Sequence, residues 1–285
     1  MRTFAYAKIN ACLNVVGKRE DGYHELEMIM LPLTLCDDIS IRFAKADWYT
    51  WNLKYRINGK NTIVKAVNCM REAYGIQEHF RIHVHKRIPT QAGLAGGSAD
   101  AAAIMLAIRD LCHIDADNEE IAQLSKQVGA DVPFCVMCQP SVVKGIGEII
   151  EPFKMNCDFD VLLLKPYKGV STKECFASID FNTCIHPDID KVKRCLTEND
   201  FDALSSCVAN TLEQPASQLV KEIGYAREYL QKKGFEVVCM SGSGSTVFAL
   251  TRKPDLIDQV MRDTNYNGWF RYKCRVLGQD VEIIS

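Results

Sequence analysis

A glycine-rich loop joins a clear strand to a clear helix, and this junction constrains the fold more than any other segment of the chain. Before the loop, residues 80–86 alternate between apolar and polar side chains, which predicts a half-buried strand. After the loop, residues 99–111 are strongly apolar and predict a helix. The connection contains Gly93, Gly96 and Gly97 and reaches Ser98. The sequence therefore predicts a pliable backbone at the N-terminus of a helix.

Such a junction suits a phosphate group. The start of a helix presents unpaired N–H groups and the positive end of the helix dipole, and glycines let the backbone approach the oxygens closely. Ser98 can cap the helix or contact phosphate or a metal ion. The loop is not a Walker A motif, since no Lys-Ser/Thr pair follows the glycines, and it is not G-x-G-x-x-G. Phosphate binding is favoured over a plain flexible loop with a serine cap.

A second glycine-rich turn, Ser241–Ser245, separates two predicted strands at residues 235–240 and 246–251. Glycine and serine dominate ordinary turns, so an ordinary loop is the simpler interpretation of this segment alone. Two phosphate-compatible turns in one chain favour a nucleotide held by both halves of the molecule.

Two polar features interrupt the apolar N-terminal strand region. Lys8 lies within the strand, where it could serve a phosphate as a point charge or discourage aggregation at a sheet edge. Tyr23 and His24 follow an Asp-Gly turn, and their rings could clamp a planar base. From these residues alone, a hairpin corner is the better interpretation of the ring pair.

Asp131 is a carboxylate between two apolar segments. In that setting it could act as a general base for an alcohol. The more frequent role of such a residue is to cap the next helix, with Pro133 in the first turn. Both interpretations stay open from the residues alone.

The chain has 13 cysteines, an odd count, and no secretory signal near its N-terminus. We therefore expect reduced thiols in the cytoplasm. Cys135 and Cys138 form a C-x-x-C pair, but no second pair has that spacing, so buried packing is favoured over zinc. His83 and His85 share a strand face without an evident third ligand, which favours a solvated face.

The composition excludes several classes of protein. The net charge is −2 and the chain is 47% hydrophobic and 25% charged, which is typical of a globular protein and not of a general nucleic-acid binder. The longest apolar run, Ala101–Ile108, is far shorter than the roughly 20 residues of a membrane helix. A length of 285 residues predicts about two domains, which we place at 1–151 and 152–285. Both halves mix helices with antiparallel strands, so the predicted class is α+β.

Taken together, these segments resemble the GHMP kinase superfamily, which includes galactokinase and the homoserine and mevalonate kinases. The resemblance covers nearly the whole chain and is strongest at residues 7–17, 21–26, 93–102, 129–134 and 241–245. It implies a two-domain α+β kinase fold with ATP and substrate in the cleft between the domains. The Asp-Gly-Tyr-His segment resembles members that phosphorylate the 2-hydroxyl of a cytidine diphosphate derivative of methylerythritol in isoprenoid synthesis.

The resemblance also implies roles for individual residues. Asp131 would take the proton from the substrate hydroxyl, and Lys8 would hold that carboxylate ionised. Ser98 would lie close to phosphate and Mg²⁺, and Asn61 would lie at the adenine. The ATP phosphates would be wrapped by Pro89, Thr90, Gln91, Ala92, Gly93, Leu94, Ala95, Gly96, Gly97, Ser98 and Ala99.

On the substrate side, the resemblance implies that Tyr23 and His24 hold the cytosine. Phe176 would cover its other face, Thr172 would make a nearby contact, and Asn10 would add a polar group. The implied partner is a small molecule, with no nucleic acid and no membrane, for a cytoplasmic bacterial enzyme that is a monomer or weak homodimer.

The chain departs from the family's usual pattern at three positions. Tyr6 replaces a proline, while Ala92 and Ala95 replace glycines that are common in the phosphate loop. An alanine that must adopt positive φ costs about 1 kcal/mol. Two other functions stay open: a different GHMP kinase, such as one for homoserine, and a non-catalytic nucleotide-binding protein. Retention of both Lys8 and Asp131 argues against the latter.

Overall fold

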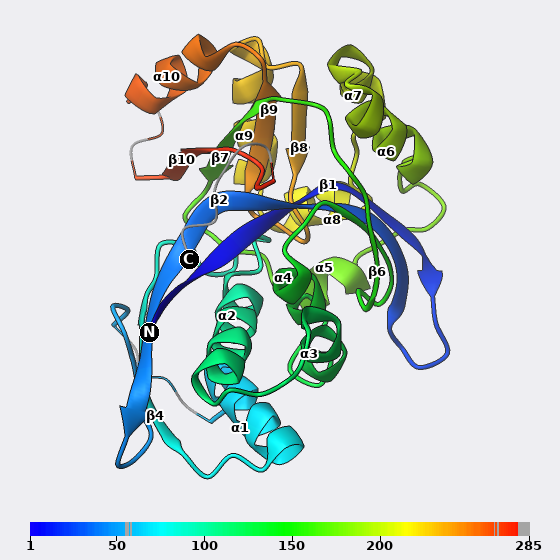
Figure 1. Cartoon of the computed structure of the whole chain (residues 1–285). Helices are drawn as coiled ribbons and strands as arrows, with labels where there is room; N and C mark the ends of the chain where they lie inside the picture. Colours follow the sequence, from blue (N-terminus) through cyan, green and yellow to red (C-terminus); the bar gives the residue numbers. More distant parts are fainter. Residues whose placement is uncertain (55–56, 58, 265, 267, 279–285) are drawn as a thin grey trace.

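The computed structural model describes residues 1–54, 57, 59–264, 266 and 268–278, and two sheets organise it (Figure 1). The first sheet has the order β3-β4-β2-β5-β6, and β1 pairs with β2 beside this path. Its neighbours are antiparallel except for β3 and β4. The strands are β1 (Arg2–Lys18), β2 (His24–Ala44), β3 (Trp48–Trp51), β4 (His79–His85), β5 (Ser141–Gly145) and β6 (Ile149–Pro152).

The second sheet is fully antiparallel and has the order β10-β7-β9-β8. It comprises β7 (Asp160–Lys165), β8 (Val237–Met240), β9 (Val247–Thr251) and β10 (Phe270–Cys274). Mixed helices with two mainly antiparallel sheets confirm the predicted α+β class.

Four helices gather on one side of β1 and β2, below them in Figure 1. They are α1 (Thr62–Tyr74), α2 (Gly96–Leu111), α3 (Asn118–Ser125) and α4 (Val132–Met137). Helix α2 packs against α1, α4 and β1, because nine of its residues from Ala99 to Ile108 are buried. Helix α1 ends where Gly75 adopts the left-handed conformation with φ of 66°, as the sequence predicted.

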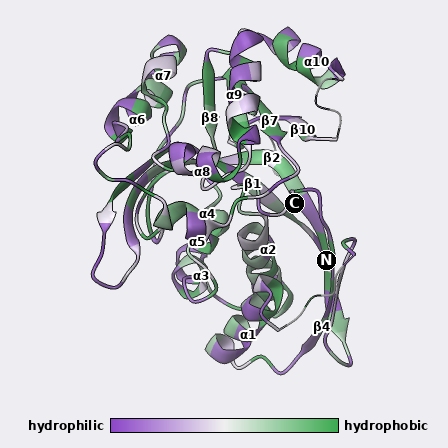
Figure 2. Ribbon diagram, turned by 180° about the vertical axis from the view of Figure 1, so that it is seen from behind, coloured by the Kyte–Doolittle hydropathy of each residue, from purple (hydrophilic) through white to green (hydrophobic). Residues whose placement is uncertain are grey.

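The second half of the chain supplies the remaining helices. Helix α9 packs on the second sheet, where β8 is hydrophobic along its length while α10 and α6 carry polar outer faces (Figure 2). The helices are α5 (Thr172–Ala177), α6 (Ile189–Glu198), α7 (Phe201–Cys207), α8 (Glu213–Leu219), α9 (Glu222–Lys232) and α10 (Pro254–Arg262). None of the helices within the described ranges is both long and apolar enough to span a bilayer.

Two hydrophobic clusters form the core, and each contains residues of both halves. The fully buried Ile9 and Leu33 of the first sheet belong to the same cluster as Phe248 of the second. Backbone bridges also join the halves, between Leu13 and Asn210 and between Leu33 and Val276. On β4, residues 80, 82 and 84 are buried and 81, 83 and 85 are exposed, which confirms the alternation read from the sequence. This shared core fixes the loops of one half against those of the other.

Candidate active site

A cavity of about 1260 Å³ lies where the loops of the two halves meet. The first half contributes strand β1, the β1–β2 hairpin, the glycine-rich loop and the segment before α4. The second half contributes α5 with its preceding loop and the turn between β8 and β9. Segments far apart in the sequence, including both glycine-rich turns, therefore face one space.

Strand β1 places Lys8 and Asn10 in this cavity where its pairing with β2 is irregular. Its register with β2 shifts between Tyr6 and Lys8 and again between Asn10 and Cys12. Such bulges redirect side chains and release backbone groups from the ladder. The N–H of Lys8 donates to the carbonyl of Leu94 in the glycine-rich loop at 3.2 Å. The strand is thereby tied directly to the predicted phosphate loop.

Lys8 and Asp131 approach each other in the cavity, as the resemblance implied. Lys8 Nζ lies 3.6 Å from Asp131 Oδ2 and donates a 2.6 Å hydrogen bond to Asn10 Oδ1. The lysine side chain is only 4% exposed, whereas the aspartate is 35% exposed. The arrangement places a buried ammonium beside a carboxylate that solvent and substrate can reach.

Asp131 occupies the helix-cap position that the alternative interpretation predicted, but its side chain does not make the capping hydrogen bond. Asp131 occupies the N-cap position of α4, and Pro133 lies in the first turn. Its backbone angles are φ −82° and ψ −9°, and its side chain accepts no capping hydrogen bond. The carboxylate is therefore free to face Lys8 instead of the helix.

The glycine-rich loop enters its helix earlier than the sequence predicted. Helix α2 begins at Gly96, three residues before the expected start, because Ala95 adopts the left-handed conformation with φ of 57° at the N-cap. Ser98 consequently lies inside the first turn, and the expectation that it caps the helix is wrong. Among the described residues its hydroxyl has no hydrogen-bond partner, and it lines the cavity with Gly97. Gly96, Gly97 and Ser98, at the start of the helix, therefore line the same space.

Close packing around the loop explains two of its glycines. A Cβ atom added to Gly93 would lie 2.0 Å from the carbonyl oxygen of Ser241, and Gly93 has φ of 74°. A Cβ at Gly96 would lie 2.9 Å from Ile88 Cγ2. These positions require glycine for close approach, and Gly93 requires it for its backbone angle as well.

A buried ion-pair cluster beneath the loop was missed by the sequence analysis. Lys86 Nζ contacts the carboxylates of Asp37 and Asp100, the latter at 2.6 Å, and all three side chains are buried. Asp37 also accepts from the N–H of Ile88 at 2.8 Å. Burial raises the pKa of Asp100, against the lowering effect of Lys86. The usable signal was an aspartate in the otherwise apolar start of α2, which requires a buried cation.

Aromatic rings gather at the opposite end of the cavity. The ring centroid of His24 lies 4.9 Å from that of Phe176 and 6.3 Å from that of Phe181. Burial lowers the pKa of His24, and Lys18 lowers it further, which favours the neutral ring. Tyr23 lines the cavity with 61% of its surface exposed. The rings of His24, Phe176 and Phe181 form an aromatic cluster, and together with Tyr23, the residue before His24, it can receive a planar group.

The remaining predicted residues divide between the cavity and its surroundings. Thr172 lines the cavity and shares a 2.8 Å hydrogen bond with Ser243, which joins α5 to the second glycine-rich turn. Asn61 caps α1 by accepting from the N–H of Ile63, and its neighbour Thr62 lines the cavity instead. Ala99 is buried below the loop. All other predicted site residues line the cavity: Lys8, Asn10, Tyr23, His24, residues 89–98, Asp131 and Phe176.

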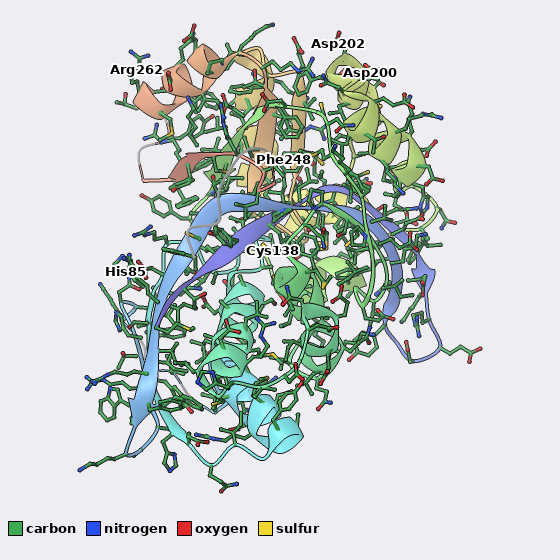
Figure 3. All side chains as sticks on the ribbon, in the orientation of Figure 1. His85, Cys138, Asp200, Asp202, Phe248 and Arg262 are labelled. Atoms are coloured by element: carbon green, nitrogen blue, oxygen red, sulfur yellow. The ribbon has the colours of Figure 1, made fainter. Side chains whose placement is uncertain are left out.

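The cysteines and histidines form no metal centre in the described part of the chain. Burial raises the pKa of the Cys138 thiol to about 12 and that of Cys135 well above its ordinary value. Cys138 lies in the middle of the molecule beside β1, whereas His85 lies at its edge (Figure 3). His83 shares a 2.9 Å hydrogen bond with Thr50 across the sheet. His83 and His85 lie on the exposed face of β4, as the sequence predicted.

Comparison with known proteins gives matches in both halves. Residues 61–139 match the model of the GHMP kinases N terminal domain, and residues 184–267 match that of the GHMP kinases C terminal domain. The 4-diphosphocytidyl-2-C-methyl-D-erythritol kinase of Clostridium acetobutylicum is 37% identical over 254 residues, covering 87% of this chain and 90% of the relative. That of Thermoanaerobacter pseudethanolicus is 39% identical over 250 residues, covering 86% of each chain.

Solved structures are also similar. A crystal structure of 4-(cytidine 5'-diphospho)-2C-methyl-D-erythritol kinase superposes with a TM-score of 0.80 at 28% identity, over 96% of this chain and 99% of that one. A homoserine kinase from Cytophaga hutchinsonii gives a TM-score of 0.79 at 17% identity, over 97% and 94% of the two chains. The latter likeness concerns the fold alone.

Proposed function

Because the chain belongs to the GHMP kinases, and among them to the family of the 4-diphosphocytidyl-2-C-methyl-D-erythritol kinases, we propose that it phosphorylates the 2-hydroxyl of that cytidyl alcohol with ATP. The reaction forms a bond between the substrate oxygen and the γ-phosphorus. It breaks the bond from that phosphorus to the bridging oxygen of ADP. The hydroxyl proton must leave as the new bond forms, and the product enters the non-mevalonate route to isoprenoids.

The observation that carries this proposal is the Lys8–Asp131 pair in a cavity that the glycine-rich loop also lines. Asp131 acts as the base for the hydroxyl proton. Lys8, fixed by Asn10 at 2.6 Å, faces this carboxylate at 3.6 Å and orients the hydroxyl. Phosphoryl transfer depends mainly on positioning and on neutralising charge, and a base beside an incoming hydroxyl completes those requirements.

The phosphates of ATP lie along residues 89–98, at the N-terminus of α2. The free N–H groups of Gly96 and Gly97 and the helix dipole supply positive potential there. The unpartnered Ser98 hydroxyl in this turn fits a Mg²⁺ ion, which binds proteins through few groups and keeps phosphate and water ligands. When bound, the ion would neutralise charge on the transferring phosphoryl group. Asn61 and Thr62 lie on the adenine side.

The cytidyl group occupies the aromatic cluster. Tyr23 and Phe176 stack on the cytosine, and the neutral ring of His24 can both donate to and accept from its polar edge. Thr172 and Asn10 contact the remainder of the substrate. We place the two domains at 1–151 and 152–285, so that the reacting groups of ATP and alcohol meet between them.

A substrate panel tests the function directly. We expect ADP to appear only when the cytidyl alcohol is added with ATP, and not with homoserine or mevalonate. ADP release without any alcohol, or phosphorylation of homoserine in place of the cytidyl substrate, would contradict the proposal. A coupled ADP assay with product mass determination separates these outcomes.

A further inference from the structure

The cavity holds an uneven distribution of charge. Among the described residues, its lining contains four lysines, at positions 8, 18, 86 and 173, and one carboxylate, that of Asp131. Lys8 faces Asp131, and Lys86 is held by Asp37 and Asp100. Two lysines of the lining are thus left without a compensating carboxylate.

These two lysines, Lys18 and Lys173, are exposed and have no hydrogen-bond or ion-pair partner among the described residues. Their neighbour Arg19 offers a contrast, since its guanidinium is engaged by Asp21 at 3.2 Å and by Glu25 at 2.9 Å. An ammonium that lines a cavity without a protein partner is available to an anionic ligand.

Both lysines stand at the aromatic cluster, although they come from different halves of the chain. Lys18 is the direct cross-strand partner of His24 in the β1–β2 pair, and its charge lowers the pKa of that ring. Lys173 lies three residues before Phe176 in α5, a spacing that brings side chains to one side of a helix. His24 and Phe176 are themselves in ring contact, with centroids 4.9 Å apart. Lys18, beside His24, and Lys173, beside Phe176, therefore both lie next to the aromatic cluster.

We infer that Lys18 and Lys173 together bind the diphosphate of the nucleotide-linked alcohol, one from each half of the molecule. The inference rests on the proposed function, because a cytidyl group held by the aromatic cluster carries its diphosphate beside the base and sugar. The ATP phosphates have a separate source of positive potential at the start of α2. The positive charge of Lys18 and Lys173 at the aromatic cluster therefore binds the diphosphate of the cytidyl alcohol. It selects against alcohols that carry no diphosphate.

Calorimetric binding of CDP, CMP and cytidine to the full chain without ATP tests this inference. The wild type should bind CDP more tightly than cytidine. Lys18→Ala and Lys173→Ala should each weaken CDP binding by about tenfold, as expected for the loss of one charge-assisted contact, and leave cytidine binding unchanged. The difference should shrink at high salt, because exposed charges are screened. Lys126→Ala, an exposed lysine outside the cavity, is the matched control and should bind CDP normally.

The outcomes separate the two proposals. Unchanged CDP affinity in both lysine variants overturns the diphosphate site while leaving the proposed function intact. Weakened ATP binding with normal CDP binding also overturns it, because the lysines would then serve the other nucleotide. A wild-type protein that binds neither CDP nor cytidine overturns the proposed function and this inference with it. If an alanine variant misfolds, Lys18→Gln and Lys173→Gln retain the side-chain length and give the same readout.

Discussion

The hydroxyl of Ser241 donates a 2.9 Å hydrogen bond to the carbonyl of Gly93, across 148 positions of sequence. The hydroxyl oxygen of Ser241 also accepts a hydrogen bond from the N–H of Asn10 at 3.1 Å. One serine of the second glycine-rich turn therefore fixes both the phosphate loop and the strand that carries Lys8. The second glycine-rich turn therefore holds the phosphate loop in place through Ser241 and also lines the cavity with residues 242–244.

Gly93→Ala should disrupt this junction. The new Cβ would lie 2.0 Å from the Ser241 carbonyl oxygen at a φ of 74°, so we expect a loss of about 3 kcal/mol in the free energy of unfolding and weaker ATP binding. Gly224→Ala is the matched control, because its Cβ meets open space on helix α9 and should be neutral or stabilising. Urea unfolding and ATP titration check both variants. Equal stability of the two would contradict this account.

Asp131→Asn should lower kcat by about 100- to 10,000-fold while ATP still binds. The amide preserves the shape of the side chain but cannot take a proton from the hydroxyl. Steady-state kinetics with the cytidyl alcohol and an ATP titration measure the two effects separately. Normal turnover would show that the carboxylate is not the base.

Ala95→Gly should raise the free energy of unfolding by up to about 1 kcal/mol, because Ala95 is held in the left-handed region at φ of 57°. Ala92→Gly should lower it by a similar amount, since Ala92 is buried with no positive φ and gains only unfolded-state freedom. Paired chemical unfolding curves test the contrast. The same sign for both substitutions would refute it.

Asp47→Asn should destabilise the fold in a pH-dependent way. Arg71 holds the pKa of Asp47 far below its ordinary value through hydrogen bonds of 2.6 and 2.8 Å, so the ionised pair stabilises the protein above about pH 4 and this contribution is lost at lower pH. We expect a loss of about 2 kcal/mol near pH 7 that shrinks as the pH falls below 4. Glu228→Gln, in an exposed i,i+4 pair, is the control and should cost under about 0.5 kcal/mol.

Cys135→Ser and Cys138→Ser should retain the catalytic mechanism. Burial raises the pKa of Cys138 to about 12, so little thiolate is present near pH 8 and alkylation should be slow. We expect some loss of stability from burying the hydroxyl, with turnover per folded molecule preserved. Turnover abolished in a folded variant would assign these thiols a chemical role.

Local patterns predicted the elements that carry the cavity better than their exact limits. The alternation of β4 and the glycine stop of α1 are local properties, and both are confirmed. The start of α2 was placed three residues late, because the apolar pattern alone does not locate a helix start at a left-handed residue. The resemblance had marked Ala95 as a replacement for a glycine, but its positive φ and its N-cap position came from the structure, and they leave Ser98 inside the first turn.

The sequence analysis did not predict the buried cluster of Lys86, Asp37 and Asp100. Asp100 in the apolar start of α2 was the one local signal, and the partnership depends on β2, the residue after β4 and α2 converging. The resemblance did place His24 and Phe176 around one group, and the structure adds that their rings are in direct contact, 4.9 Å apart between centroids.

By itself, the sequence determined the kinds of group available: a pliable loop before a helix, a lysine in a strand, and a carboxylate before a proline. Those properties depend on neighbouring residues, so spacing and composition express them directly. Only the tertiary structure decided which groups meet. The bulges of β1 turned Lys8 toward Asp131, and the uncapped N-terminus of α4 left that carboxylate free. The packing of the two sheets through hydrophobic clusters that both halves share sets such long-range contacts, and a periodic pattern does not encode them.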